Sequence, residues 1–323
     1  MKPGRPSATI TIDGKSLTAY EAGVVRLTVD MAHGTHHTAE LMLWPKSKFA
    51  STAAGASITV ALGVDGDDED LLTGEVAGMG GSPEAVRLDA VSATIALSRS
   101  RKSQTYISQS IADIVNDLAS EVDVDEVSAD LTLSAYSVDL RRTVWAHLVE
   151  LASLAGADLG CAGSGGLRFV PPASGPGSFT FMFGATVLEW HIANVTSPPV
   201  PKVAPSGAAS EQGSDKWHWL LHDPVGEAAD PTRVVGAFHT RDAADALVKS
   251  LKERAARSAV RGSLRLVGEA GLRPGEVIEI KDLPGPAAGP FRLLNVRHTF
   301  DARYGFYTDA TVEGSGDTGG LPV

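Results

Sequence analysis

The chain has 323 residues, a formal net charge of −11 and a single cysteine. The length suits two or three domains, and the acidic balance argues against a nucleic-acid partner, because such proteins normally present a basic face. The lone Cys161 excludes an internal disulfide. No apolar segment is long enough to span a membrane, and the N-terminus lacks a stretch of signal-peptide length, so we expect a protein synthesised in the cytoplasm.

Residues 1–97 are expected to form a first antiparallel β-barrel. Hydrophobic and polar residues alternate in ATITIDG and VVRLTVDM, and further candidate strands follow at short spacing: AELMLW, ASITVALGV, LLTGEVAGM and EAVRLDAVSATIAL. Asp-Gly, Gly-Gly and Ser-Pro pairs separate these runs, which is typical of turns. Several such strands in succession indicate a barrel or a sandwich.

Residues 98–165 are expected to form an α/β decoration with two amphipathic helices. The apolar face of the first helix has helical spacing: Ile111, Ile114, Val115 and Leu118. Ser110 is the expected N-terminal cap, with Asp113 three residues later. The apolar face of the second helix is expected to comprise Leu140, Val144, Leu148, Leu151 and Ala152. Gly156 is the expected C-terminal cap of this second helix.

Residues 166–260 are expected to contain strands, an insertion and a third helix. The strands are GLRFV and SFTFMFGATVLEWHI, and the segment from Ser197 to Arg233 is rich in Pro, Gly and Ser near its start. The third helix is expected to bury Ala244, Leu247, Val248 and Leu251. Residues 261–323 are expected to complete a second β-barrel and to end in a tail. There Pro274-Gly275 is expected to form a tight turn before the strand VIEI.

Three stretches in this order resemble the baseplate hub proteins of contractile injection systems and tailed phages, namely the VgrG/Pvc8 family and the late control gene D proteins. The first is Arg101–Val124, in which a basic and polar strand leads into a helix. The second is Tyr136–Val170, a helix ending in a glycine turn and followed by a hairpin. The third begins with GLRPGEVIEI and continues through GPFRLLNVRHTFD and YGFYTDATVEG. The segment Ser197–Arg233 does not align with the family.

The resemblance implies an α+β, mainly β fold with two hub-type antiparallel β-barrels per chain and helical decorations. It further implies a homotrimer whose barrels form a pseudo-sixfold ring. Such a ring joins a hexameric tail tube to a trimeric spike among other baseplate components of a phage-tail-like particle. No fused spike domain can fit in this sequence, so the spike is expected to be a separate protein. No enzymatic activity and no catalytic, cofactor-binding or metal-binding residue is implied.

Two alternatives come from the residues themselves. HGTHH, with His33, His36 and His37, together with the acidic run DGDDED could serve a metal-assisted hydrolase, although a turn and a hairpin tip are the simpler interpretations. The apolar island WHWLL (Trp217–Leu221) could be the contact of a free-standing binding module. AGSGG nearly matches a nucleophile elbow, but Ala162 replaces the leading glycine and a strand follows it. Cys161 is expected to be a buried or turn thiol, and His298 a strand-end residue that packs or forms a hydrogen bond.

Overall fold

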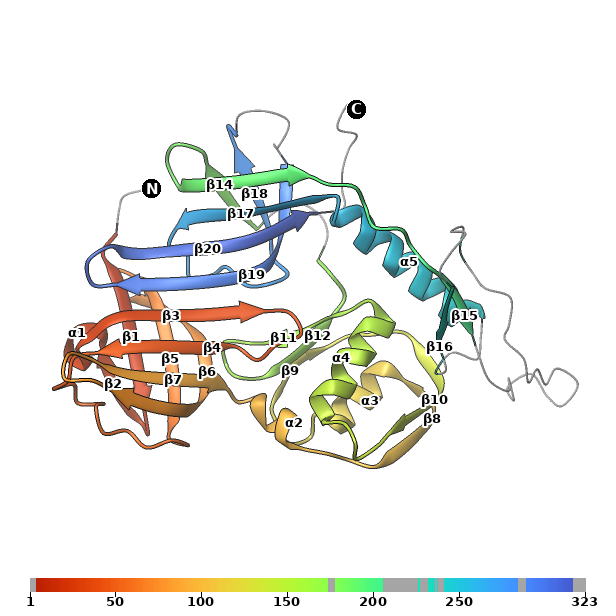
Figure 1. The fold of residues 1–323 in the computed structure, drawn as a ribbon, viewed down its shortest axis with the longest axis horizontal. Helices are drawn as coiled ribbons and strands as arrows, with labels where there is room; N and C mark the ends of the chain where they lie inside the picture. Colours follow the sequence, from red (N-terminus) through yellow and green to blue (C-terminus); the bar gives the residue numbers. More distant parts are fainter. Residues whose placement is uncertain are drawn as a thin grey trace, which may run out of the picture.

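The N-terminal part of the chain forms a curled antiparallel half-sheet (Figure 1). The computed structural model describes residues 4–173, 178–205, 226, 232–235, 237, 241–283 and 289–315. The strands of this half-sheet are β1 (Pro6–Ile12), β2 (Lys15–Thr18), β3 (Val24–Ala32), β4 (Thr38–Leu43), β5 (Ser57–Val64), β6 (Asp67–Gly81) and β7 (Val86–Ser92). They pair in the order β3, β4, β7, β6, β5, β1 and β2. Alternate side chains enter a buried core, as the sequence alternation predicts.

A short helix, α1 (Ala19–Ala22), connects β2 to β3 and was not predicted from the sequence. Thr18 accepts a hydrogen bond from the backbone N–H of Glu21, and the Glu21 carboxylate accepts one from the backbone N–H of Thr18. This is a capping box, whose Thr-x-x-Glu signature is present in the sequence. Gly23 ends the helix with a φ of 67°, a left-handed conformation that favours glycine.

Strands near the C-terminus form a second half-sheet that continues the first. They are β13 (Phe179–Met182), β14 (Val187–Asn194), β17 (Val260–Val267), β18 (Val277–Lys281), β19 (Gly289–Asp301) and β20 (Gly305–Gly314). The predicted turn before β18 is confirmed, because Gly275 has a φ of 94° and donates its N–H to the carbonyl oxygen of Leu293. The two half-sheets join where β19 pairs with β3, from Asn295 opposite Ala32 to Asp301 opposite Arg26.

Hydrogen bonding therefore links the two regions predicted as separate barrels into one sheet. Among the described residues, the main path runs β14, β17, β20, β19, β3, β4, β7, β6, β5, β1 and β2, and β18 and β13 branch from β19. The ends of this path, β14 and β2, do not pair with each other in the described structure. The mainly β prediction is correct, while the observed unit is one curled sheet with two halves rather than two hydrogen-bonded closed barrels.

A second hydrophobic core lies beside the sheet and contains the helices other than α1 (Figure 1). Its elements are α2 (Ile95–Arg99), β8 (Gln104–Ser110), α3 (Ile111–Leu118), β9 (Val124–Val127), β10 (Thr132–Val138), α4 (Val144–Ala155), β11 (Asp158–Cys161), β12 (Leu167–Val170), β15 (Lys202–Pro205), β16 (Thr232–Val235) and α5 (Arg241–Arg257). Helix α5 packs against α4 in this core and leads directly into β17. None of the described helices combines the length and apolar character needed to cross a membrane.

The predicted helices are confirmed, with two corrections. Ser110 caps α3 by accepting from the N–H of Asp113, and Gly156 ends α4 with a φ of 66°. Leu140 is wrong as a helix-face residue, because α4 begins only at Val144 and Leu140 is 60% exposed. The predicted strand through residue 97 ends at Ser92, because the chain leaves the sheet there and forms α2, which buries Leu97 in the second core.

Much of the insertion after Ser197 and the tail after Ser315 lie outside the described residues. This includes WHWLL at residues 217–221, so the structure does not bear on the binding-module alternative.

Candidate functional site

The loop HGTHH connects β3 to β4 and docks onto the helical part of the molecule. Trp145 of α4 donates its indole N–H to the carbonyl oxygen of Gly34, at 3.2 Å, and the N–H of Gly34 donates to the carbonyl oxygen of Leu159, at 2.8 Å. The interpretation of HGTHH as a turn between strands is therefore confirmed. Its position shows a further role, because this turn ties the sheet to α4 and β11.

His36 forms the centre of this docking contact. Its Nδ1 lies 2.9 Å from Oγ1 of Thr94 and its Nε2 lies 2.6 Å from Oγ of Ser98. The imidazole ring also packs against the Trp145 indole, with 4.1 Å between ring centroids. Burial, aided by the nearby Arg99 guanidinium, lowers the pKa of His36 to about 4. The ring is therefore neutral at pH 7, and it contributes hydrogen bonds and packing to the contact rather than a charge.

The only cysteine, Cys161, contacts Thr94, which is one of the two hydroxyl partners of His36. Its Sγ is 2.9 Å from Oγ1 of Thr94 and 3.4 Å from Oγ of Ser92, and the side chain is buried as predicted. Thr94 thus links the loop histidine to the β11–β12 hairpin through two side-chain contacts. The buried thiol therefore packs against these two hydroxyl groups.

His37 points in a different direction and is only 1% exposed. Burial, followed by the nearby Arg273 guanidinium, lowers the pKa of His37 to about 3. Its Nδ1 is buried without a hydrogen-bond partner among the described residues. The three histidines of the loop therefore occupy separate environments. Within the described ranges, no group of three or more His, Cys, Asp or Glu side chains is arranged to hold a metal ion.

A network of buried charges continues from His33 into the sheet. Arg292 of β19, 2% exposed, donates to the carboxylates of Asp158 and Glu313, and its second contact, from Nη1 to Oε1 of Glu313, measures 2.8 Å. Arg257 at the end of α5 donates to the same Glu313 oxygen at 3.2 Å. Arg292 also donates to Nε2 of His33 at 3.2 Å, which requires that nitrogen to be unprotonated. Burial lowers the pKa of His33 despite the opposing effect of Asp158, in agreement with this neutral form.

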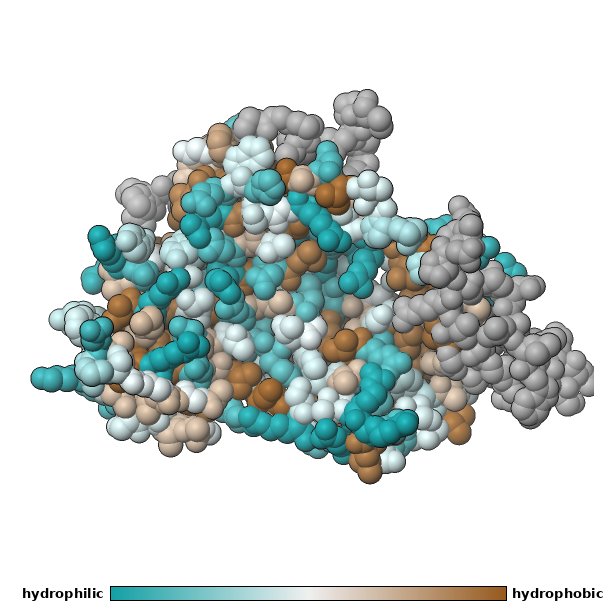
Figure 2. All heavy atoms as spheres, viewed as in Figure 1, coloured by the Kyte–Doolittle hydropathy of each residue, from teal (hydrophilic) through white to brown (hydrophobic). Residues whose placement is uncertain are grey.

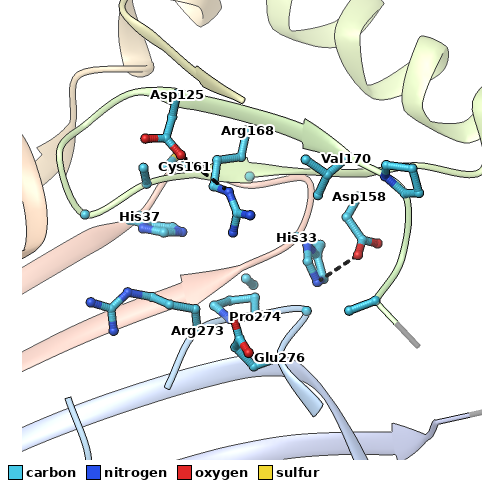
Figure 3. A pocket seen from close by; sticks show the side chains of 17 residues that line it. His33, His37, Asp125, Asp158, Cys161, Arg168, Val170, Arg273, Pro274 and Glu276 are labelled. Carbon is cyan, nitrogen blue, oxygen red and sulfur yellow. Dashed lines mark ion pairs between the residues drawn. The ribbon is translucent and has the colours of Figure 1, made fainter. Parts of the chain in front are cut away.

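The network lies beside a cavity of about 220 Å³ (Figure 3). Four segments contribute to its lining: His33 and His37 come from the loop, Asp158 and Arg168 from the β11–β12 hairpin, Asp125 from β9, and Arg273 and Glu276 flank the Pro274-Gly275 turn. We call this meeting point of the four segments the junction. Its charges are largely paired with one another, for example Arg168 with Asp125 at 3.5 Å. The arrangement suits holding the sheet and helical core together.

The other two candidate motifs also have packing roles. DGDDED forms the tip between β5 and β6, where Asp65 and Gly66 adopt φ angles of 57° and 89°, so the hairpin-tip interpretation is confirmed. AGSGG turns β11 into β12 and packs closely on β6. A Cβ added at Gly163 would lie 1.9 Å from the carbonyl oxygen of Asp70. The hydrolase alternative therefore receives no support from the geometry of the residues on which it rested.

We expect Gly163→Ala to destabilise the protein by about 1–3 kcal/mol, because the added methyl group overlaps the β6 backbone and must displace it. Gly160→Ala is the matched control on the same hairpin, since its added Cβ would meet nothing within 4 Å. Urea unfolding of both variants measures the difference. Equal stability of the two variants would mean that the hairpin does not pack against β6 in solution.

We expect the stability of the protein to fall as the pH is lowered from about 6.5 towards 4. The unfolded chain binds a proton on His37 near its ordinary pKa of 6.5, whereas the folded chain does so only near 3. Between these values the unfolded state holds more protons, so each pH unit costs about 1.4 kcal/mol for this group. Denaturant titrations at several pH values measure this slope. His37→Gln should reduce this slope by about 1.4 kcal/mol per pH unit, while His36 and His298, whose pKa values are also lowered, maintain the rest. An unchanged slope in that variant would contradict the assignment.

A row of alternating charges crosses the exposed face of the sheet. Glu189, Arg265, Asp309, Arg297 and Asp30 occupy directly paired positions on β14, β17, β20, β19 and β3. Arg265 Nε lies 2.7 Å from Asp309, and Arg297 Nε lies 2.5 Å from Asp30. Opposite charges on facing residues favour one register, and the Arg297–Asp30 pair does so across the join between the two half-sheets. Figure 2 shows hydrophilic side chains spread over the middle of the molecule, where these strands lie in Figure 1.

Sequence reasoning missed the residues that join the segments: Arg257, Asp158, Arg292 and Glu313. The sequence contains only a weak indication of these buried charges. Arg292 and Glu313 each stand among apolar residues in FRLL and TVEG, which marks a charged residue that is either at a strand edge or buried. A buried charge needs a partner, but the sequence does not name that partner.

Solved structures of tail proteins share this fold. The tail protein of Neisseria meningitidis MC58 has a TM-score of 0.73 and 16% identity, over 97% of this chain and 97% of that one. The 43 kDa tail protein of prophage MuSo2 from Shewanella oneidensis has a TM-score of 0.71 and 12% identity, over 96% of this chain and 99% of that one. The chain thus has a phage tail protein fold.

The same fold occurs in a bacterial secretion apparatus. The Escherichia coli c3393 protein has a TM-score of 0.62 and 13% identity, over 94% of this chain and 76% of that one. It is a component of the type VI secretion system and is structurally similar to the T4 bacteriophage tail proteins gp27 and gp5. The sequence itself matches no protein-family model and no curated protein.

Proposed function

We propose that this chain is the structural hub of a baseplate, in a phage tail or a related contractile injection particle. In this role it adapts a hexameric tail tube to a trimeric spike. The likeness to the Neisseria and Shewanella tail proteins supports the proposal, because it extends over nearly the whole of each chain. The likeness to a type VI secretion component supports a role common to both kinds of particle.

The observation that carries the adaptor role is the joining of two curled half-sheets in one chain through β3 and β19. Three copies of such a chain supply six half-sheets around a threefold axis. One face of the ring can then approximate sixfold symmetry, while the other keeps true threefold symmetry for a spike. The pairing of β3 with β19 makes the two halves of each copy parts of one continuous sheet.

The proposal includes the predicted division of the chain into segments 1–97, 98–165, 166–260 and 261–323. The first and last segments supply most strands of the two half-sheets, residues 166–260 add β13 and β14, and the helical core decorates them. Its partners are two further copies of the chain, a separate trimeric spike protein, a hexameric tube protein and other baseplate components. The protein is assembled in the cytoplasm and acts in the baseplate without a catalytic residue.

Light scattering of the purified chain tests this proposal, first alone and then after co-expression with neighbouring genes for tube and spike candidates. The expected result is a threefold mass, or a stable complex with a trimeric spike. A chain that stays monomeric at all concentrations and binds neither partner would overturn the proposal.

A further inference from the structure

The HGTHH loop places three histidine rings where the sheet meets the helical core. His33 contacts β19 and β11, His36 contacts α2 and α4, and His37 lines the cavity of the junction. His37 is buried, and the other two rings are half-buried. A change in the charge of these rings therefore acts directly on the contact between the sheet and the helical core.

His33 is held in its unprotonated form by a hydrogen bond. Nη2 of Arg292 donates to Nε2 of His33 at 3.2 Å, and an N–H donates only to a ring nitrogen that carries no proton. Asp158 and Glu313 lie nearby and favour a charged ring, but both already accept from Arg292. A proton on Nε2 would break this hydrogen bond and bring two cations together.

His36 faces hydroxyl groups and a cation. Its ring nitrogens contact Oγ1 of Thr94 and Oγ of Ser98, and the ring packs on the indole of α4. Arg99, at the end of α2, disfavours a positive charge on His36, and this guanidinium is itself paired with Glu75 at 2.6 Å. A proton on His36 therefore adds a charge to a contact that is built from hydroxyl groups and an indole.

His37 is the most deeply buried of the three rings. Its Nδ1 has no hydrogen-bond partner among the described residues, and burial, followed by Arg273 and the other two rings, disfavours its protonation. The same cavity is lined by the other charged residues of the junction (Figure 3): Asp125, Asp158, Arg168 and Glu276. Two of these carboxylates are already paired with arginines. These charges do not offset burial, because the pKa of His37 still falls to about 3.

The rings couple the docking of the helical core to pH. A ring released into water takes up a proton near its ordinary pKa of 6.5, whereas docked His36 and His37 do so only near 4 and 3. Below pH 6.5 the undocked state therefore binds more protons, and docking weakens as the pH falls. At pH 5.0, compared with pH 7.5, each of these two rings favours the undocked state by about 30-fold. Ordinary carboxylates, with pKa values of about 4, remain ionised at pH 5.0.

We propose that the HGTHH loop is an acid-sensitive tie, which holds the helical core on the sheet at neutral pH and releases it when His33, His36 and His37 become protonated. The sheet and the helical core each keep their own hydrophobic cluster, so the two parts remain folded after release. This device is built within one chain and does not depend on the proposed ring.

The single cysteine can report this release. Cys161 is buried between the two parts, with its Sγ 3.4 Å from Oγ of Ser92 and 3.8 Å from the carbonyl oxygen of Thr35. Dithiodipyridine labels thiols in weak acid, and its rate with the full-length chain is divided by its rate with the urea-unfolded chain at the same pH. We expect this normalised rate to rise at least about a thousandfold between pH 7.5 and 5.0, since two rings contribute about 30-fold each. Circular dichroism should remain unchanged over this range.

Glutamine variants separate the tie from general acid sensitivity. His36→Gln and His37→Gln retain hydrogen-bonding groups but cannot take up a proton, so each should reduce the rise in labelling about 30-fold, and the double variant about a thousandfold. His298→Gln is the matched control. His298 is also fully buried with a pKa of about 3, but it contacts Thr308 and the carbonyl oxygen of Leu272, away from the loop. This variant should keep the wild-type rise.

Three results would overturn the acid-sensitive tie. The first is a normalised labelling rate of the wild-type chain that stays constant between pH 7.5 and 5.0. The second is a rise of wild-type size in the folded double variant. The third is an equal reduction in His298→Gln, because labelling would then follow unfolding of the whole chain rather than release of the helical core. Each of these results leaves the hub proposal standing, since light scattering tests that proposal separately.

Discussion

Replacing Arg292 with methionine is expected to lower the free energy of unfolding by about 3–5 kcal/mol. Arg292 is 2% exposed and bonds to both Asp158 and Glu313. Methionine fills similar volume but removes this cation from the half-buried Asp158 and from the buried Glu313. Removing one partner of a buried ion pair costs more than the pair contributes, because the remaining charge keeps its desolvation penalty. Equilibrium unfolding in urea at pH 7 measures the change.

Arg87→Met is the matched control for this substitution. Arg87 also contacts two carboxylates, Glu40 at 3.0 Å and Asp89 at 2.9 Å, but its side chain is 58% exposed. Exposed ion pairs contribute about 0–1 kcal/mol, so this variant should remain close to the wild type. Comparable effects of Arg292→Met and Arg87→Met would show that the junction network is solvated and does not hold the segments together.

Replacing Trp145 with alanine is expected to lower the free energy of unfolding by about 3–5 kcal/mol. The indole is 8% exposed, packs on His36 and donates to the Gly34 carbonyl. Its loss removes apolar burial and also the main contact between α4 and the β3–β4 loop. We therefore expect separate unfolding of the helical core and the sheet, visible as a second transition by calorimetry.

Trp44→Ala provides the control, because Trp44 lies at the end of β4 and is 62% exposed. Its stability should stay within about 0.5 kcal/mol of the wild type. A single cooperative transition in Trp145→Ala with wild-type stability would contradict the role of the loop as the tie between the two cores.

Much of the local structure could be predicted because its causes are local. Period-two alternation placed β1, β3, β4 and β5, and helical spacing placed α3, α4 and α5. Ser110, Gly156 and Gly275 mark their cap and turn positions by their own chemistry. The errors arose where local pattern was ambiguous. TIAL after β7 suits a strand or a helix, and only the second core selects the helix by burying Leu97.

The candidate site could not be predicted in the same way. HGTHH was recognised as the most unusual polar loop, and its interpretation as a turn was correct. Its partners were not foreseen, because Trp145 lies 111 positions from Gly34 along the chain. Likewise, the buried charge network draws Arg257 from α5, Asp158 from β11 and Arg292 from β19, and no window of the sequence contains them together.

The sequence by itself therefore determined the mainly β character, the helices with their caps, the turns and the acidic balance of this protein. Only the tertiary structure decided that the two half-sheets join through β3 and β19, and that Arg292, Asp158 and Glu313 meet between them. The physical reason is the range of the interactions. Backbone preference and alternation act over a few neighbouring residues, whereas strand order and buried ion pairing depend on which distant segments exclude water together.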